Sequence, residues 1–255
     1  MKLHFLGTCA GTEPMERRQH MSVVLEVNDR LYFFDAGEGC SRTAHLMGLD
    51  LLKTEKIIIS HPHIDHIGGL PNLLWCIRKI AWTKNQTPGA VDLYIPRQSI
   101  LDGVMQLLKG EEDFMRKLPI NAHKVEDGIL FDDGCVKMTA IHNTHIKMTE
   151  EKEWTSFSYL VEAENKKIVF SGDLGEYQEL DPLIGDGCDI AILETGHFHI
   201  DDTYVYAKDK KIGKVLFCHN GRELLNFPKQ SAEKIERLFG KKAIICEDRT
   251  TIEIN

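Results

Sequence analysis

Four side chains that can bind metal ions lie within six positions of this chain, in the segment His61-Pro62-His63-Ile64-Asp65-His66. The apolar run Lys56–Ser60 before the segment is typical of a strand buried on both faces. Residues 68–80 after it carry leucine and isoleucine at helical spacing. The segment is therefore predicted to form the turn between a buried strand and a helix, a context that makes a metal-binding motif specific.

One short turn cannot wrap four ligands around a single ion. Imidazole and carboxylate groups bind zinc at about 2.0–2.2 Å, and one ion accepts about four ligands. His61 and His63 alternate along the chain and are expected to face one ion, whereas Asp65 and His66 face a second. Two-metal hydrolases hold their ions about 3.5–4 Å apart. The segment therefore predicts half of a dinuclear metal site.

Further ligands are expected where other predicted strands meet loops. His145, Asp173 and His219 each occupy such a position. His142 competes with His145 for the same role, and we favour His145 because it lies at the very end of the predicted strand 135–142. Asp35 ends a predicted strand ahead of Gly37, and a carboxylate behind metal-bound histidines also sets their tautomer.

The length of 255 residues suits one large domain or two tightly joined halves. Strands are expected at 3–6, 22–27 and 31–35, with a hairpin turn at Asn28-Asp29, and a helix is expected over most of 97–118. The second half repeats this plan, with buried strands at 189–194, 214–219 and 243–246. Two sheets with helices outside them form the economical architecture.

Composition excludes several classes of protein. The net charge of −8 repels polyanions such as nucleic acids, unless a local basic patch compensates. Seven widely separated cysteines without a CxxC pair argue against a disulfide framework and fit a reducing cytosol. The N-terminus has no signal-peptide core, and no apolar run is long enough to span a membrane. We expect a cytoplasmic protein with no membrane partner.

Several motifs together make the chain recognisable. They are Phe5-Leu6-Gly7-Thr8 with Ala10, Gly11 and Pro14, then Phe34-Asp35-Ala36-Gly37-Glu38-Gly39, the histidine segment continuing as Ile67-Gly68-Gly69-Leu70-Pro71, Ser171-Gly172-Asp173, and His219. The chain resembles the metallo-β-lactamase superfamily, and its first 75 residues are most similar to the ribonuclease Z-like phosphodiesterase branch. The resemblance implies an α/β fold, a four-layer αββα sandwich. It also implies one domain over residues 1–255, with pseudo-symmetric halves of about 1–130 and 131–255.

The resemblance also implies how the ligands divide between two divalent ions, zinc first, with manganese or iron as alternatives. One ion takes His61, His63 and His145, the other takes Asp65, His66 and His219, and Asp173 bridges them. Asp35 is implied as the carboxylate behind these ligands, and Asp65 is counted among the catalytic residues. The nucleophile would be a hydroxide bridging the metals, because bound water loses a proton near neutral pH.

A phosphodiesterase also needs a proton for the leaving alkoxide, and the segment Glu194–His199 offers two histidines. Relatives of ribonuclease Z use a histidine upstream of the last ligand. His199 lies 219 minus 199, or 20, residues before His219 and is favoured. His197 is near enough to serve instead.

The chain departs from ribonuclease Z where that enzyme carries its transfer-RNA-gripping arm. Only 173 minus 145, or 28, steps separate His145 from Asp173, and three glutamates follow His145 closely. We therefore favour a short or small phosphodiester, such as a cyclic nucleotide or another cyclic phosphate, over transfer RNA. The substrate-binding residues stay undefined, and the family suggests a homodimer.

Other chemistries share these ligands. A glyoxalase-like acyl, thioester or lactone hydrolase is the main alternative, since the metal ligands do not distinguish a phosphoryl from an acyl centre. Zinc β-lactamases commonly place a cysteine where Asp173 stands, which argues against that activity. A di-iron redox protein would need an electron-carrier domain, for which the chain has no room.

Overall fold

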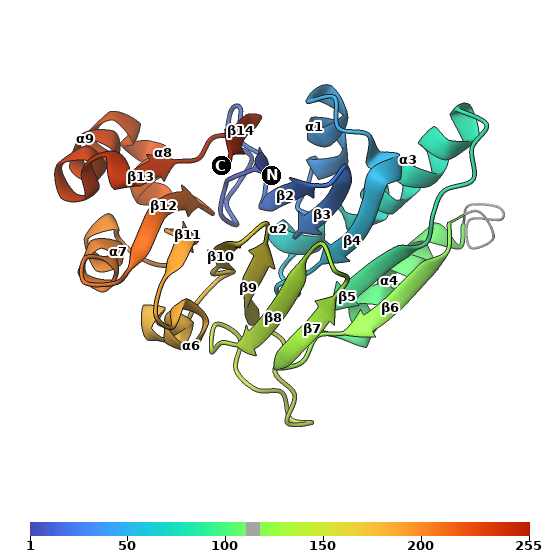
Figure 1. Ribbon diagram of the computed structural model, residues 1–255. Coiled ribbons are helices and arrows are strands. Elements are labelled where there is room, and N and C mark those ends of the chain that lie inside the picture. The colour runs from blue at the N-terminus through green and yellow to red at the C-terminus, as the bar shows by residue number, and fades with distance from the viewer. Residues whose placement is uncertain (111–117) are drawn as a thin grey trace. The chain divides into compact units, whose positions relative to one another are not determined.

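A computed structural model describes residues 1–110 and 118–255. The chain divides into two compact units (Figure 1). The first unit contains residues 1–7, 13–125 and 248–255, and the second contains residues 8–12 and 126–247.

The first unit is built on a seven-stranded sheet with the order β14-β1-β2-β3-β4-β5-β6. Its strands are β1 (Lys2–Gly7), β2 (Ser22–Val27), β3 (Arg30–Phe34), β4 (Thr54–Ile58), β5 (Val91–Ile95), β6 (Ile120–Lys124) and β14 (Thr250–Glu253). Its helices are α1 (Cys40–Leu46), η1 (Leu51–Lys53), α2 (Ile64–Ile67), α3 (Leu70–Thr83) and α4 (Gln98–Leu108). The strands β14, β1, β2 and β3 pair antiparallel, and β3 to β6 pair parallel.

Apolar residues at helical spacing hold α3 against this sheet. Leu70, Leu73, Leu74 and Ile77 are buried in one cluster with side chains of α1, α4 and the sheet. The helix begins with proline in its first turn, where no backbone hydrogen bond is lost. These helices cover one face of the sheet (Figure 1). The helix after the histidine segment, predicted from the sequence, is thus confirmed.

The second unit repeats this plan with a seven-stranded sheet of order β13-β12-β11-β10-β9-β8-β7. Its strands are β7 (Gly128–Asp132), β8 (Lys137–His142), β9 (Phe157–Ala163), β10 (Lys166–Phe170), β11 (Cys188–Glu194), β12 (Ile212–Cys218) and β13 (Ala243–Ile245). Its helices are η2 (Tyr177–Leu180), α6 (Asp181–Ile184), α7 (Ile200–Ala207), α8 (Arg222–Asn226), α9 (Pro228–Phe239) and η3 (Gly240–Lys242). The strands β10 to β13 pair parallel, so their carboxyl ends share one edge of the sheet.

Most of the expected elements are present, with local differences. Asn28 and Asp29 adopt positive φ angles of 48° and 64°, which confirms the tight hairpin turn between β2 and β3. The helix expected over most of 97–118 is observed from Gln98 to Leu108, and positions 111–117 of the expected range lie outside the described residues. The edge strands β7 and β14 were not predicted, because their half-exposed residues lack a buried apolar run.

Within the described ranges, no helix combines the length and the apolar character needed to cross a membrane.

Candidate metal centre

The histidine segment begins on the turn after β4 and continues into α2. His61 and His63 lie on the turn, and Asp65 and His66 lie on the helix. His61, Asp65 and His66 are buried, whereas His63 is exposed. His61 Nε2 lies 3.0 Å from His63 Nδ1, and His66 Nε2 lies 3.3 Å from Asp65 Oδ2. The pairing expected from the alternation of residues is therefore present within the first unit.

Asp35 orients two imidazoles, His66 directly and His61 through Ser60. The fully buried Asp35 carboxylate accepts hydrogen bonds from Ser60 N (2.7 Å), Ser60 Oγ (2.8 Å) and His66 Nδ1 (2.7 Å). Because the Ser60 hydroxyl donates to Asp35, it accepts from His61 Nδ1 at 3.0 Å. Both rings then carry their proton on Nδ1 and present an unprotonated Nε2, the form that binds a metal ion.

The backbone around Asp35 has an unusual conformation and lies very close to α2. Asp35 has a φ of 59°, a left-handed conformation that aspartate tolerates better than most residues. A Cβ added at Gly37 would lie 2.4 Å from the Asp65 backbone oxygen, so glycine is required for the α2 turn to reach this strand end. His219 also follows a strand directly and has a φ of 51°. Such strained residues cluster at functional sites.

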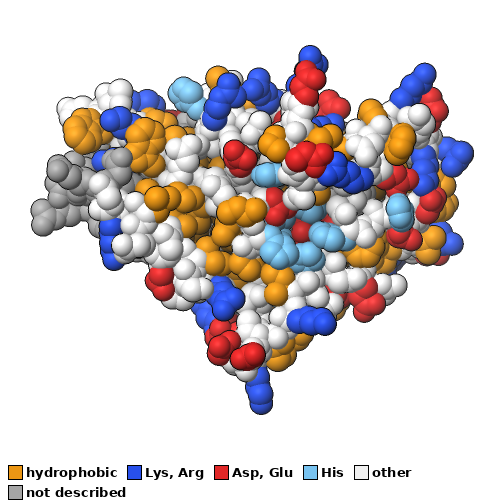
Figure 2. All heavy atoms as spheres, turned by 180° about the vertical axis from the view of Figure 1, so that it is seen from behind, with side chains coloured by type: hydrophobic (Ala, Val, Ile, Leu, Met, Phe, Trp, Pro, Cys, Tyr) orange, Lys and Arg blue, Asp and Glu red, His pale blue; other side chains and the backbone are white. Residues whose placement is uncertain are grey.

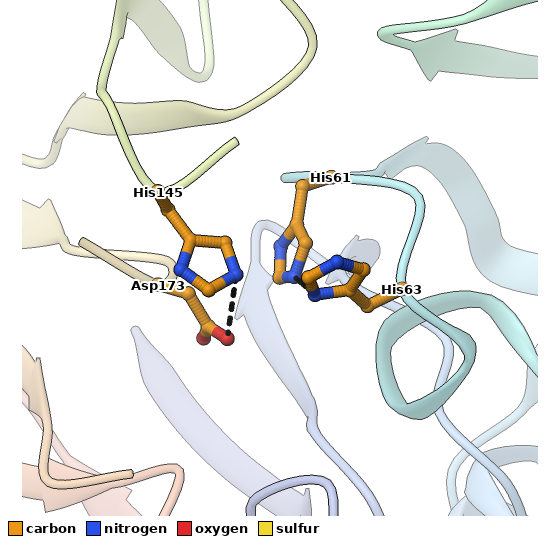
Figure 3. A group of neighbouring side chains, drawn as sticks. All are labelled: His61, His63, His145 and Asp173. Carbon is orange, nitrogen blue, oxygen red and sulfur yellow. Dashed lines mark hydrogen bonds and ion pairs between the residues drawn. The ribbon is translucent and has the colours of Figure 1, made fainter. Parts of the chain in front are cut away.

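In the second unit, Asp173 lies between two histidines. Its Oδ2 is 3.6 Å from His145 Nε2, and its Oδ1 is 3.3 Å from His219 Nδ1. Asp173 and His219 are buried. Figure 3 shows the contact between His145 and Asp173 as a dashed line. These residues follow β8, β10 and β12, the positions at which the sequence predicted ligands.

The sequence reasoning missed Glu194, the last residue of β11. Its buried carboxylate accepts hydrogen bonds from Leu174 N (2.7 Å), His197 N (3.0 Å) and His197 Nδ1 (2.9 Å). Burial raises the pKa of Glu194, but the contacts with His197 and His219 outweigh this effect and leave the pKa below its ordinary value. The signal was available, because Glu194 ends a buried strand between two strands whose ends supply predicted ligands.

The two candidate proton donors lie in different surroundings. His197 Nδ1 is 3.9 Å from Asp173 Oδ2, and Asp173, Glu194, His197 and His219 form one group whose ligand atoms lie within 4.8 Å of one another. The hydrogen bond to Glu194 raises the pKa of His197. His199 instead faces Glu223, with Nδ1 3.3 Å from its Oε2, and its side chain is 78% exposed. The geometry thus brings His197, not the favoured His199, to Asp173.

His142 is the last residue of β8, and His145 lies three positions beyond the strand end. The sequence argument that placed His145 at the very end of the strand is therefore wrong, because β8 turns into a loop at His142. His142 hydrogen-bonds Asp127 through Nδ1 (2.7 Å), and its ring stacks on Trp154 at 4.3 Å between centroids. His145, not His142, faces Asp173.

The spacing of these atoms suits a metal ion. Two ligands at about 2.0–2.2 Å from one tetrahedral ion lie roughly 3.3–3.6 Å apart. Across the four ligand pairs described above, the corresponding atoms lie 3.0–3.6 Å apart. The donor set of imidazole and carboxylate groups is also the one that zinc accepts.

Comparison with solved structures identifies the fold. Human tRNase Z, short form, has the same fold with a TM-score of 0.76 at 20% identity over 100% of both chains. The metallo-β-lactamase fold protein YhfI of Bacillus subtilis has a TM-score of 0.73 at 15% identity over 98% of both. The two mixed sheets flanked by helices therefore confirm the predicted α/β sandwich of the metallo-β-lactamase type.

At the sequence level, ribonuclease BN of Cronobacter sakazakii is 37% identical over 147 residues, which cover 57% of this chain and 46% of the relative. The chain spans about half the length of the curated relatives it matches. The predicted similarity to the ribonuclease Z-like branch is confirmed by these matches. A family model described as anti-Pycsar protein Apyc1 matches residues 1–233. The chain therefore belongs to the anti-Pycsar protein Apyc1 family.

Proposed function

We propose that this protein is a dinuclear metal-dependent phosphodiesterase acting on short or cyclic phosphodiesters. The observation that carries the proposal is the pair of ligand clusters, one in each unit, with atom spacings that suit metal ions. The names ribonuclease BN and tRNase Z among its relatives support phosphodiester chemistry.

The proposal treats residues 1–255 as one functional domain and assigns seven side chains to two ions. His61, His63 and His145 would hold one ion, Asp65, His66 and His219 would hold the other, and Asp173 would serve both. Zinc is the first choice, with manganese or iron as alternatives that the same donor set accepts. Bound metal ions would neutralise charge on the phosphoryl oxygens and activate the attacking water.

The protein's own groups then orient ligands and move protons. Asp35 and Ser60 hold the rings of His61 and His66 in the metal-binding tautomer. Asp65 would take the proton of the attacking water. His197, hydrogen-bonded through Nδ1 to Glu194, would donate a proton from Nε2 to the leaving oxygen. His199 is the alternative donor, since its ring is exposed and oriented by Glu223.

A small substrate is favoured over transfer RNA. Residues 143–156 and the β9–β10 hairpin fill the interval between His145 and Asp173, which leaves no room there for a long arm. The net charge is −8, and Figure 2 shows lysine and arginine side chains scattered among acidic ones on the face drawn. RNA binding depends on clustered cations that neutralise phosphates.

We also propose a cellular compartment and an oligomeric state for this protein. We place the protein in the cytoplasm because, in the part of the chain that the structure describes, no cysteine is in a disulfide. We infer a homodimer from the family resemblance alone. A measurement of the protein's molecular mass in solution would test this inference.

The decisive experiment measures hydrolysis of bis(p-nitrophenyl) phosphate and of cyclic nucleotides by the metal-loaded protein. Chelation should abolish turnover, and His63→Ala should reduce it at least 100-fold, roughly the loss of a group central to metal catalysis. His45→Ala, an exposed histidine at the end of α1, is the matched control and should retain activity.

Two outcomes would contradict the proposal. Turnover that survives both the chelator and His63→Ala would remove the metal centre from the reaction. Much faster turnover of lactoylglutathione or a lactone would instead assign the site to acyl or thioester hydrolysis.

A further inference from the structure

Two loops of the second unit carry proposed metal ligands and lie side by side. One follows β8 and bears His145, and the other follows β10 and bears Asp173. We propose that Glu179, on η2, is a positioning residue that locks these loops together and so sets the geometry of the His145–Asp173 pair. This inference rests on the proposed metal centre and assigns a role to a residue outside it.

The Glu179 carboxylate bridges the two loops through backbone groups. Its Oε1 accepts a hydrogen bond from Thr144 N at 2.8 Å, next to His145. Its Oε2 accepts from Gly175 N at 3.1 Å and Glu176 N at 3.2 Å, shortly after Asp173. Hydrogen bonds to a charged acceptor are stronger than those between neutral groups. One side chain therefore binds three donors that belong to two ligand-bearing loops.

Helix capping alone does not explain this arrangement. Glu176 and Glu179 form a capping box at the start of η2, in which each side chain accepts from the other residue's backbone N–H. That motif accounts for the contact with Glu176 N. It does not require the contact with Thr144 N, which lies 35 positions away in the chain. The second oxygen of Glu179 is thus used for a long-range connection.

The loops are also packed closely at the same place. A Cβ added at Gly175 would lie 2.1 Å from Thr144 Oγ1 and 3.2 Å from the Thr144 carbonyl carbon. The absence of a side chain at Gly175 lets Thr144 approach its backbone directly. A shift of either loop would therefore be transmitted to the other.

A buried polar chain anchors the strand side of the same loop. Asn143 Oδ1 accepts from His145 N at 3.2 Å, and Asn143 Nδ2 donates to Ser158 Oγ at 3.1 Å. Ser158 Oγ in turn donates to the Ser171 carbonyl oxygen at 2.5 Å, two residues before Asp173. These buried hydrogen bonds hold the loop of His145 to the neighbouring strands, and Glu179 adds a separate connection between this loop and the loop of Asp173. Partners that orient metal ligands typically change metal affinity about 10–100-fold when mutated.

The test compares Glu179→Gln with Glu176→Gln in the full-length protein, by titrating zinc against a chromophoric chelator and by recording the visible spectrum with cobalt bound. Both variants lose one negative charge on the same short segment, but only the first loses an acceptor for the two loops. We expect Glu179→Gln to lower the zinc affinity of one of the two metal sites at least tenfold and to change the cobalt spectrum. Glu176→Gln should leave the zinc affinity and the cobalt spectrum unchanged.

A second variant guards against misfolding. Glu179→Asp keeps the charge but shortens the side chain by one methylene, so its carboxylate cannot reach Thr144 N and Gly175 N together. We expect it to reproduce the loss of affinity, while the metal-free variant still unfolds in a single cooperative urea transition, which shows that it is folded.

The outcomes separate this inference from the proposed function. Wild-type protein that binds no divalent ion would overturn the metal centre and the inference with it. Wild-type protein that binds two ions, with Glu179→Gln or Glu179→Asp binding them equally well, would overturn the role of Glu179 alone. Equal weakening by Glu176→Gln would also overturn it, because the effect would then come from charge.

Discussion

Replacing Asp35 with asparagine removes a buried charge while keeping the shape of the side chain. Asparagine also tolerates the left-handed φ of 59° at this position, so the backbone need not move. The amide, however, can accept on one side only. If its oxygen keeps the Ser60 N–H, its NH₂ group faces His66 Nδ1. The imidazole proton must then move to His66 Nε2, the nitrogen that faces Asp65.

The expected loss is worked from the contact with His66, and the amide nitrogen also faces Ser60 Oγ, which orients His61. The hydrogen bond from His66 Nδ1 to the Asp35 carboxylate is 2.7 Å long and fully buried. A bond to a charged group contributes about 1.5–3 kcal/mol. At about 1.4 kcal/mol per factor of ten, metal affinity should fall roughly 10- to 150-fold. Hydrolysis measured at limiting metal concentration should fall in parallel.

The assay titrates zinc against a chelator for wild type, Asp35→Asn and a matched control. Asp29→Asn serves as the control, because Asp29 also has a positive φ, of 64°, in the same unit but lies exposed in a hairpin turn and contacts only Lys53 among the ion pairs described. Its zinc affinity should equal that of wild type. Wild-type zinc affinity in Asp35→Asn would refute the argument that Asp35 sets the tautomer of His66.

Three further predictions concern stability and are read from urea unfolding. Gly103→Ala on α4, where an added Cβ meets no atom within 4 Å, should raise the free energy of unfolding by about 0.5–1 kcal/mol; a decrease would contradict the helical assignment. Tyr177→Phe deletes a buried hydroxyl 2.8 Å from the Glu194 carbonyl oxygen and should lower the free energy of unfolding by about 1–3 kcal/mol; no change would mean that water replaces the bond. Burial raises the pKa of Asp92, but hydrogen bonds from neighbours including Lys56 outweigh it and lower the pKa. The stabilisation by Asp92 should therefore be complete above about pH 4 and be lost as the pH falls through the lower folded value, and Asp92→Asn should flatten this acid dependence.

Much of the first half of the site was readable from local sequence. The four proposed ligands in this half lie within six positions, 61–66, and they follow an apolar run whose residues are all buried. Asp35 was predicted from its place at a strand end, and its contacts with Ser60 and His66 agree with the proposed role. Such short-range patterns survive folding because strand, turn and helix are each specified within a few residues.

The second half of the site depends on contacts between distant residues, which the spacing of residues in the sequence does not predict. Glu194 ends a predicted strand, but only the structure shows its carboxylate close to Asp173 and His219. The choice between His197 and His199 was made by which ring turns toward Glu194 and which toward Glu223. Rotamers of adjacent loop residues leave no periodic signal in a sequence.

The sequence by itself predicted the fold class correctly and supplied the seven proposed ligands and the proposed chemistry, because strands and motifs are encoded by neighbouring residues. Only the tertiary structure decided which groups orient those ligands, as Asp35 does for His66 and Glu179 for the loops of His145 and Asp173. The physical reason is that hydrogen bonds between distant segments depend on the register and closure of the whole sheet, which no local pattern encodes.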